Sequence, residues 1–207
     1  MTDIETLDAL PLIAILRGLT PEGAPAVGDA LVEAGFRVLE VPLNSPRPLD
    51  SIRILARRFE GRALVGAGTV LTPETARETV QAGGRLIISP NTDPAVIAET
   101  RRLQAVSLPG VFTPTEAFAA LGAGAHALKL FPAEIAGPAG LKALRAVLPS
   151  ETRLYAVGGV APDTLAEWRR AGASGFGIGS ALYKAGMDAA EVGRRARAFV
   201  NAWKAGY

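Results

Sequence analysis

Short apolar runs recur along the chain, and segments with helical spacing separate them. Runs that are apolar almost throughout indicate strands buried on both faces, as in a parallel sheet covered by helices. The intervening segments, such as TPETARETVQAGG and TPTEAFAALGAG, begin with Thr-Pro and end in glycine, which is typical of helix starts and stops. Strands and helices are therefore predicted to alternate, with eight strands at residues 12–17, 38–43, 63–70, 86–90, 105–111, 127–132, 153–160 and 175–182.

This alternation predicts a compact (β/α)8 TIM barrel that forms one domain over residues 1–207. The hydrophobic content of 49% is ample for the large core that a barrel requires. The alternative is an open doubly wound sheet, which usually carries a GxGxxG turn after its first strand, whereas this chain reads RGLTPEG there. The tail from Met187 to Tyr207 has apolar residues at helical spacing and is expected to be the last barrel helix.

Composition narrows the classes of partner. The chain has 22 Lys and Arg against 20 Asp and Glu, and it shows no basic cluster, so no nucleic-acid partner is expected. With no cysteine and a single histidine, His126, neither a metal site nor a cofactor is expected. The N-terminus MTDIETLDAL does not resemble a secretory signal, and no apolar run reaches about 18 residues, so we expect a cytoplasmic protein without a membrane partner.

One lysine stands in the middle of an apolar strand. Lys129 lies in the run ALKLFP, whereas the other three lysines lie in segments that are expected to be helix, loop or tail. Burial among apolar side chains disfavours an ammonium and lowers its pKa, and the neutral amine is the form that attacks a carbonyl carbon. Lys129 alone allows two interpretations: an imine-forming lysine, or a lysine neutralised by a carboxylate for structural reasons.

The chemistry of a parallel barrel gathers at the C-terminal ends of its strands, where charged residues carry the most information. Arg17 closes the first predicted strand, and Glu40 lies in the second. Side-chain alternation lets Glu40 and Lys129 point into the barrel, where they should meet one another or a shared ligand. The combination is the pattern of a class I aldolase, in which Lys129 forms an iminium with a ketone and Glu40 moves protons. A purely structural Glu-Lys pair remains the alternative.

Two further side chains favour a keto acid as the substrate. The planar guanidinium of Arg17 can hold a carboxylate with two hydrogen bonds. Thr69, at the end of the third predicted strand, could add a hydroxyl group, although a β-branched strand residue can also bond only locally. A ketone that carries a carboxylate fits these residues better than a simple ketone.

Glycines end the last two predicted strands. VGGV contains Gly158 and Gly159, and GIGSAL contains Gly179 and Ser180. Backbone amides can approach an anion closely at these loops, which is where barrels commonly bind phosphate. Either motif alone could serve only a tight turn. Two on adjacent strands predict a sugar phosphate, held without any need for a basic side chain.

The ordered segments PLIAILRG, VLEVPLNSP, VGAGTVL, LIISPN, ALKLFPAE, AVGGV and GIGSALY span nearly the whole chain and resemble the 2-keto-3-deoxy-6-phosphosugar-acid aldolases. Within that family the chain is most similar to the branch that cleaves the phosphogalactonate substrate. Asn44 stands where enzymes of the phosphogluconate type typically carry arginine, Val157 where they carry threonine, and Asn91 where they carry glycine. These positions are expected to sense stereochemistry.

The resemblance implies that Lys129 is the Schiff-base lysine and that Glu40 is a general acid and base acting through water. The products would be pyruvate and glyceraldehyde 3-phosphate, no metal would take part, and the protein would be a homotrimer. Without an arginine at position 44, Arg17 would carry more of the carboxylate binding. The alternatives are a phosphogluconate or 4-hydroxy-2-oxoglutarate preference and, more remotely, a phosphosugar-binding barrel without lyase activity. The resemblance assigns substrate binding to Arg17, Asn44, Thr69, Pro90, Asn91, Phe131 and Val157, and phosphate binding to Gly158, Gly159, Gly179 and Ser180.

Overall fold

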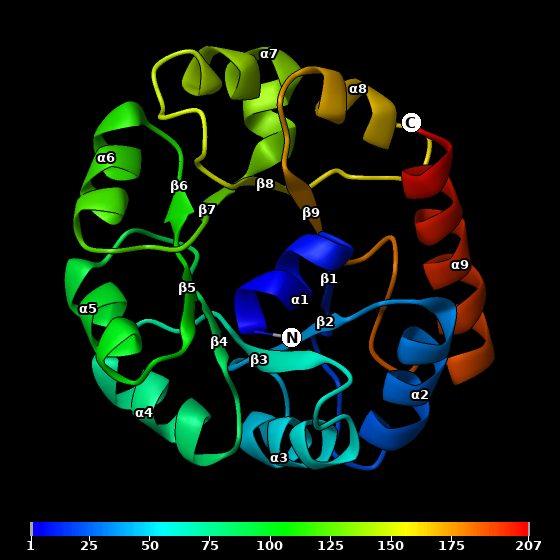
Figure 1. The fold of residues 1–207 in the computed structure, drawn as a ribbon. Coiled ribbons are helices and arrows are strands. Elements are labelled where there is room, and N and C mark those ends of the chain that lie inside the picture. Colours follow the sequence, from blue (N-terminus) through cyan, green and yellow to red (C-terminus); the bar gives the residue numbers. More distant parts are fainter. Residues whose placement is uncertain (1, 207) are drawn as a thin grey trace.

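The computed structural model describes residues 2–206 and shows a ring of parallel strands surrounded by helices (Figure 1). In the sheet order β5-β4-β3-β2-β1-β9-β8-β7-β6, the two end strands are consecutive in the chain, so the sheet closes on itself. The predicted TIM barrel is confirmed. Its strands are β1 (Leu12–Ile15), β2 (Val38–Pro42), β3 (Leu64–Gly68), β4 (Leu86–Ile88), β5 (Val106–Leu108), β6 (Gly110–Val111), β7 (Leu128–Leu130), β8 (Leu154–Val157) and β9 (Gly175–Ile178).

The fifth predicted strand, residues 105–111, is divided into β5 and β6 at Pro109. Proline has no N–H to donate to a neighbouring strand, so the ladder is interrupted at this residue. Its carbonyl still accepts a hydrogen bond of 2.9 Å from the backbone N–H of Lys129. Pairing with β7 therefore continues past the proline, and the barrel closes there.

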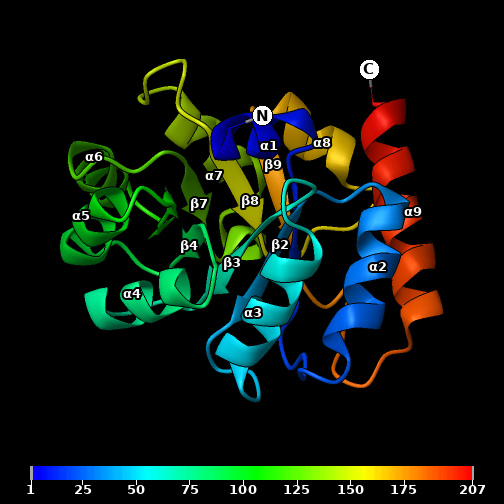
Figure 2. The same cartoon turned by 60° about the horizontal axis from the view of Figure 1, so that its bottom comes forward.

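Helices follow the strands around the outside of the ring. Their predicted start signals are confirmed, because the side chains of Thr72 and Thr113 each cap the helix that follows, with proline at its first turn. The predicted tail helix is also present and packs beside α2 (Figure 2), although Tyr207 lies outside the described residues. The outer helices are α2 (Ala24–Ala34), α3 (Pro48–Arg58), α4 (Pro73–Gln81), α5 (Pro94–Arg102), α6 (Pro114–Gly122), α7 (Ala133–Arg145), α8 (Leu165–Arg170) and α9 (Ala189–Ala205).

An additional helix that the apolar pattern did not predict, α1 (Asp3–Ala9), crosses the N-terminal end of the barrel. Thr2 and Glu5 form a capping box at its start, which stabilises this short helix. The buried hydroxyl of Tyr155 donates to the Leu7 carbonyl at 3.2 Å, and Arg153 binds Asp8 through two bonds of 2.7 Å. These contacts hold α1 across the N-terminal end of the barrel, which it covers, opposite the C-terminal ends of the strands.

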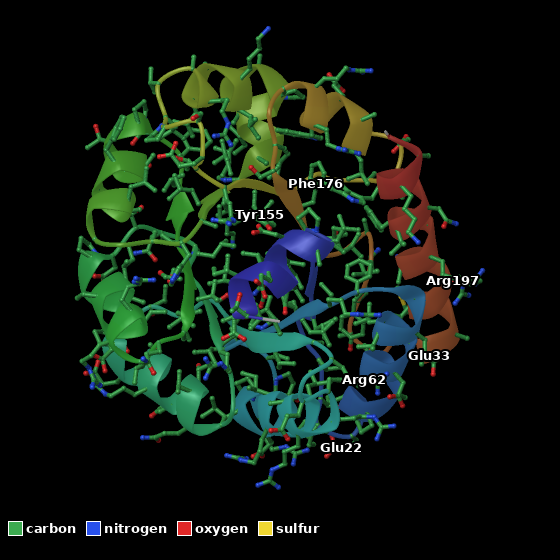
Figure 3. All side chains as sticks on the ribbon, viewed as in Figure 1. Glu22, Glu33, Arg62, Tyr155, Phe176 and Arg197 are labelled. Carbon is green, nitrogen blue, oxygen red and sulfur yellow. The ribbon has the colours of Figure 1, made fainter. Side chains whose placement is uncertain are left out.

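The core has two layers. In Figure 3, Tyr155 lies inside the ring of strands, whereas Arg197 lies on the periphery. The inner layer includes Val38 and Ala127, and the larger outer layer lies between strands and helices. Because side chains alternate along a strand, Glu40 and Lys129, each two residues further on, also point into the barrel. The predicted inward orientation of both residues is confirmed.

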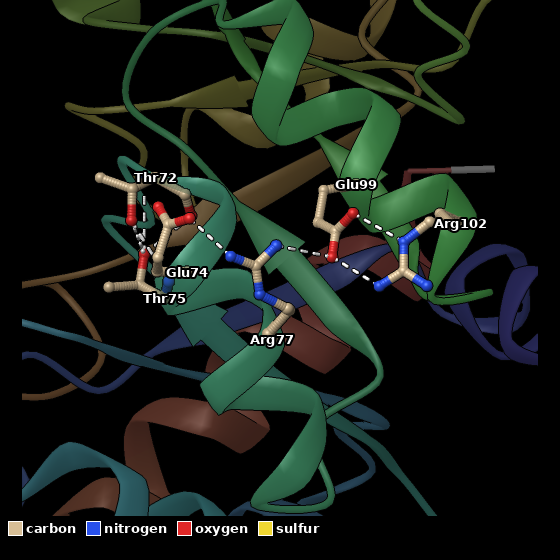
Figure 4. A network of polar contacts seen from close by, with 6 residues as sticks. All are labelled: Thr72, Glu74, Thr75, Arg77, Glu99 and Arg102. Carbon is tan, nitrogen blue, oxygen red and sulfur yellow. Dashed lines mark hydrogen bonds and ion pairs between the residues drawn. The ribbon is translucent and has the colours of Figure 1, made fainter.

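An exposed network on the outside ties α4 to α5 (Figure 4). Arg77 bonds Glu74 at 2.5 Å and Glu99 at 3.0 Å, and Glu99 also bonds Arg102 at 2.7 Å. Hydrogen bonds from Arg102 and Arg77 lower the pKa of Glu99 to about 2. The network lies on α4 and α5 and none of its residues lines the cavity described below, so it supports the scaffold.

Within residues 2–206, no helix is long and apolar enough to cross a membrane. In the same part of the chain, no group of three or more His, Asp or Glu side chains is gathered as a metal ion would require.

Candidate active site

A cavity of about 860 Å³ opens at the C-terminal ends of the strands, the end of the barrel opposite α1. Residues from β1, β2, β3, β7, β8 and β9, or from the loops that follow them, contribute to its wall. The cavity brings together most of the site residues that the sequence predicted. These are Arg17, Glu40, Thr69, Lys129, Phe131, Val157, Gly158, Gly159, Gly179 and Ser180.

Lys129 is buried at the base of this cavity, with 7% of its surface exposed. Its ammonium nitrogen lies 4.5 Å from the centre of the Phe131 ring. Burial lowers the pKa of Lys129, nearby Glu40 opposes that shift, and the positive charge of Arg17 adds to it. The lowered pKa increases the fraction of neutral amine, which is the nucleophilic form.

Glu40 is the second buried ionisable group of the cavity. Burial raises its pKa to about 7, against the opposing charges of Lys129 and Arg17 and a hydrogen bond from the Gly68 backbone. Its Oε2 atom has no hydrogen-bond partner. A carboxyl group with a pKa near 7 can both give and accept a proton at neutral pH.

Glu40 and Lys129 influence one another electrostatically but do not touch. In the part of the chain that the structure describes, no hydrogen bond or ion pair joins their side chains. A lysine held in the core only for charge neutralisation would need its carboxylate in contact. The separation therefore favours the interpretation in which both groups act on a shared ligand.

Two glycines in β3 allow close packing beside the cavity. A Cβ atom on Gly68 would lie 2.1 Å from Oε2 of Glu40, so this glycine makes room for the carboxylate, whereas a Cβ atom on Gly66 would lie 1.9 Å from the Leu86 carbonyl oxygen, so that glycine makes room for β4. Gly66 is also the register partner of Glu40. Sequence reasoning missed this role, although the signal was present: VGAG places glycines two apart in a strand, hence on one face.

Thr69, directly after β3, lines the cavity with an unusual backbone. Its φ of 58° lies in the left-handed region, which β-branched residues rarely adopt. Such a conformation persists only where surrounding structure enforces it, and it is most common at functional sites. The geometry thus favours the functional interpretation of Thr69 over that of an ordinary strand residue.

Arg17 is held in place by the loop after β2. Its Nη1 donates to Oδ1 of Asn44 at 2.6 Å, and the neighbouring Gly18 N–H donates to Oγ of Ser45 at 3.0 Å. Asn44 does not itself line the cavity, so the structure connects it to the site through Arg17. This arrangement shows how a guanidinium can be oriented at the cavity without an arginine at position 44.

Two predicted residues, Pro90 and Asn91, do not line the cavity. They follow β4, where the Gly110 backbone packs closely against them: a Cβ atom on Gly110 would lie 2.3 Å from the Pro90 carbonyl oxygen. The structure therefore does not bring Pro90 and Asn91 together with the other predicted residues.

The rim formed after β8 and β9 exposes unpaired backbone donors. Gly158 and Gly159 have φ values of 115° and 66°, conformations that favour glycine. Among the described residues, the N–H groups of Gly158, Gly159 and Ser180 have no protein acceptor. Successive N–H groups without acceptors can form an anion-binding concavity, and the phosphate-binding role of these residues stays a prediction.

Three polar residues of the cavity wall were missed from the sequence: Glu134, Tyr183 and Lys184. Glu134 is the second residue of α7, and its carboxylate lies against Gly158, where an added Cβ atom would be 1.7 Å from Oε2 of Glu134. Tyr183 is buried, and this burial raises its pKa. A usable signal existed, because each residue lies within a few positions of a strand's C-terminal end.

The fold and the cavity define a (β/α)8-barrel enzyme with a buried lysine and a buried glutamate facing one substrate-sized space. The chain belongs to the KDPG and KHG aldolase family, whose model matches residues 4–197.

Named relatives and a solved structure are similar over nearly the whole chain. A probable 2-dehydro-3-deoxy-6-phosphogalactonate aldolase from Rhizobium meliloti (strain 1021) is 50% identical over 95% of this chain and 93% of its own. The 2-dehydro-3-deoxy-6-phosphogalactonate aldolase of Escherichia coli (strain K12) is 48% identical over 94% and 95%. A structure described as native KDPGal matches with a TM-score of 0.94 and 47% identity, covering 95% of this chain and 96% of that one.

Proposed function

We propose that this chain is a class I aldolase that cleaves 2-dehydro-3-deoxy-6-phosphogalactonate to pyruvate and glyceraldehyde 3-phosphate. The observation that carries the proposal is the pair of buried groups Lys129 and Glu40, which line one cavity without bonding to one another. The substrate class is supported by the relatives of that name, which are about half identical to this chain.

The reaction begins at the substrate ketone. The neutral amine of Lys129 adds to C2, and the resulting carbinolamine loses its hydroxyl group as water to give an iminium. Glu40, with a pKa of about 7, is suited to supply the proton that this leaving hydroxyl group needs. The iminium is an electron sink next to the bond that breaks.

Cleavage of the C3–C4 bond follows. Glu40, now a carboxylate, removes the C4 hydroxyl proton through a water molecule, and C4 leaves as the aldehyde carbon of glyceraldehyde 3-phosphate. The bonding electrons move to C3 and form an enamine on Lys129. Protonation at C3 and hydrolysis of the imine then release pyruvate and restore the free amine.

The rest of the cavity positions the two ends of the substrate. Arg17, oriented by Asn44, is placed to hold the C1 carboxylate, and the Thr69 hydroxyl supplies a further hydrogen bond. The unpaired N–H groups of Gly158, Gly159 and Ser180 are placed to hold the phosphate. The bound substrate thus lies with its carboxylate at Arg17, after β1, and its phosphate at the rim after β8 and β9.

Preference for the galactonate epimer is assigned to Val157. It lines the cavity between Lys129 and the phosphate rim, and it presents methyl groups where a threonine would present a hydroxyl group. A site without that hydroxyl group loses a hydrogen bond that can discriminate between epimers at C4. Asn44 contributes through its effect on Arg17.

The test is pyruvate release from 2-dehydro-3-deoxy-6-phosphogalactonate and from its gluconate epimer under identical conditions. A preference for the galactonate compound, or comparable use of both, supports the proposal. A strong gluconate preference contradicts the role given to Val157. Absence of pyruvate from either epimer contradicts lyase activity and favours a barrel that only binds phosphosugars.

We also propose a homotrimer that works in the cytoplasm. Large apolar side chains are exposed after three strands: Leu71 after β3, Phe112 after β6 and Ile135 after β7, the last with 72% exposed. Burial between subunits would remove such surface from water. The cytoplasm is supported by the substrate, because a phosphorylated carboxylate does not cross a bilayer unaided.

A further inference from the structure

We propose that Lys184 binds the phosphate group of the substrate as its charge partner. The inference rests on the proposed function and adds a cation to a rim that the glycine motifs described only by its backbone. Lys184 lines the same cavity as Gly158, Gly159 and Ser180.

The charge of the ligand calls for a cation at this rim. A phosphate monoester carries about −1.5 to −2 charges at pH 7. Three cations line the cavity: Arg17, Lys129 and Lys184. Arg17 and Lys129 both shift the pKa of Glu40, so they lie at the reacting end, whereas Lys184 does not contribute to that shift. Lys184 is thus the cavity's remaining cation for the far end.

The loop after β9 fixes Lys184 beside the rim. The N–H groups of Leu182 and Tyr183 both donate to the Gly179 carbonyl, at 2.9 and 3.0 Å, which winds the chain into a tight turn. Arg195 from α9 donates to the Ala181 carbonyl at 3.3 Å and secures the turn from outside. Lys184 then follows directly, close to Ser180 in the chain and on the same wall.

The ammonium of Lys184 is available for a ligand. The residue is exposed, and within residues 2–206 it forms no ion pair or side-chain hydrogen bond. Glu134 makes a positive charge at this rim more important, because the Glu134 carboxylate lies against Gly158 and would repel a phosphate held there. Backbone N–H groups carry only partial charges, so a full positive charge offsets this repulsion better.

The first experiment compares Lys184→Gln with the wild type on the phosphorylated substrate and on the same keto acid without phosphate. We expect KM for the phosphorylated substrate to rise about tenfold or more, since charge-assisted hydrogen bonds are among the stronger ones. The kcat should stay within about twofold, and kinetics on the unphosphorylated keto acid should not change. Lys184→Arg should retain most of the affinity. Lys142→Gln, an exposed lysine on α7 that does not line the cavity, is the matched control.

A second experiment does not depend on turnover. Inorganic phosphate should raise the thermal midpoint of the wild type and of Lys142→Gln, and it should raise that of Lys184→Gln much less. An unchanged KM in Lys184→Gln, an equal rise on both keto acids, or an equal thermal shift would overturn the inference while leaving the aldolase proposal standing. If the wild type released no pyruvate, the aldolase proposal would fail, and the phosphate titration would still decide the role of Lys184.

Discussion

Single residues are the best guide to the function of this chain, above all those whose charge does not suit the apolar segment around them. Lys129 and Glu40 could be found from the sequence because a charged residue in an apolar strand is costly unless it has a task. Their lack of direct contact could not be predicted, because it depends on side-chain placement across the barrel. Lys184 and Glu134 were missed because a charged residue in a loop has no such conflict with its neighbours.

The pKa of Glu40 predicts how stability depends on pH. Because its pKa is raised to about 7 in the folded protein, the folded state binds this proton more tightly than the unfolded state. The corresponding stability is complete below about pH 4.5 and is lost as the pH rises through about 7. Glu40→Gln should therefore match the wild type near pH 4 and exceed its free energy of unfolding at pH 8.5 by roughly 1–3 kcal/mol.

Urea denaturation at the two pH values measures this difference. The same substitution in a Lys129→Gln background should show a larger gain, since Lys129 lowers the pKa of Glu40. A difference between Glu40→Gln and the wild type that does not change with pH would contradict the raised pKa. The kcat of Glu40→Gln should also fall by about 10²–10⁴ if Glu40 transfers protons in the reaction.

At the scale of elements, the sequence predicted most of the strands and helices, but not the short helix α1 or the interruption of the fifth predicted strand. Apolar runs and Thr-Pro starts located the strands and several helices, since burial and capping are local signals. The helix α1 was missed because its seven residues are too few for a clear apolar period. The division at Pro109 follows from the missing N–H, which alters the ladder without ending the strand pair.

Strand β3 shows how an element prepares the site. We expect Gly68→Ala to reduce kcat severely while leaving most of the stability intact, because the new methyl group would occupy the space of the Glu40 carboxylate. Kinetics and thermal unfolding of the same preparation separate the two effects. Gly122→Ala, where an added Cβ atom meets nothing within 4 Å, is the control. Normal kcat in Gly68→Ala would show that the carboxylate need not lie against this glycine.

For the whole molecule, ring closure is what assembles the site. Arg17 follows β1 and Glu40 lies in the neighbouring strand β2, whereas Lys129 comes from β7, far along the chain, and the closed ring brings all three to one cavity. The barrel could be predicted because eight similar units leave few other arrangements. Contacts between subunits could not be predicted from the residues, because exposed apolar side chains show that a surface can be covered but not which surface covers it.

The homotrimer predicts a definite mass in solution. Light scattering coupled to size-exclusion chromatography should give three times the chain mass of 21.4 kDa. Ile135→Asp, which places a charge on the most exposed of the large apolar side chains in the described residues, should shift the population toward monomer. A wild-type mass of one or two chains would contradict the trimer.

The central claim is that Lys129 forms an imine with the keto acid, and borohydride reduction in the presence of pyruvate tests it directly. We predict a covalent adduct in the intact-mass spectrum, located on Lys129 by peptide mapping, and no adduct in Lys129→Ala, which should also lack turnover. Lys142→Ala should be labelled as fully as the wild type. Failure to label the wild type, or a label on another lysine with Lys129→Ala still active, would contradict the account.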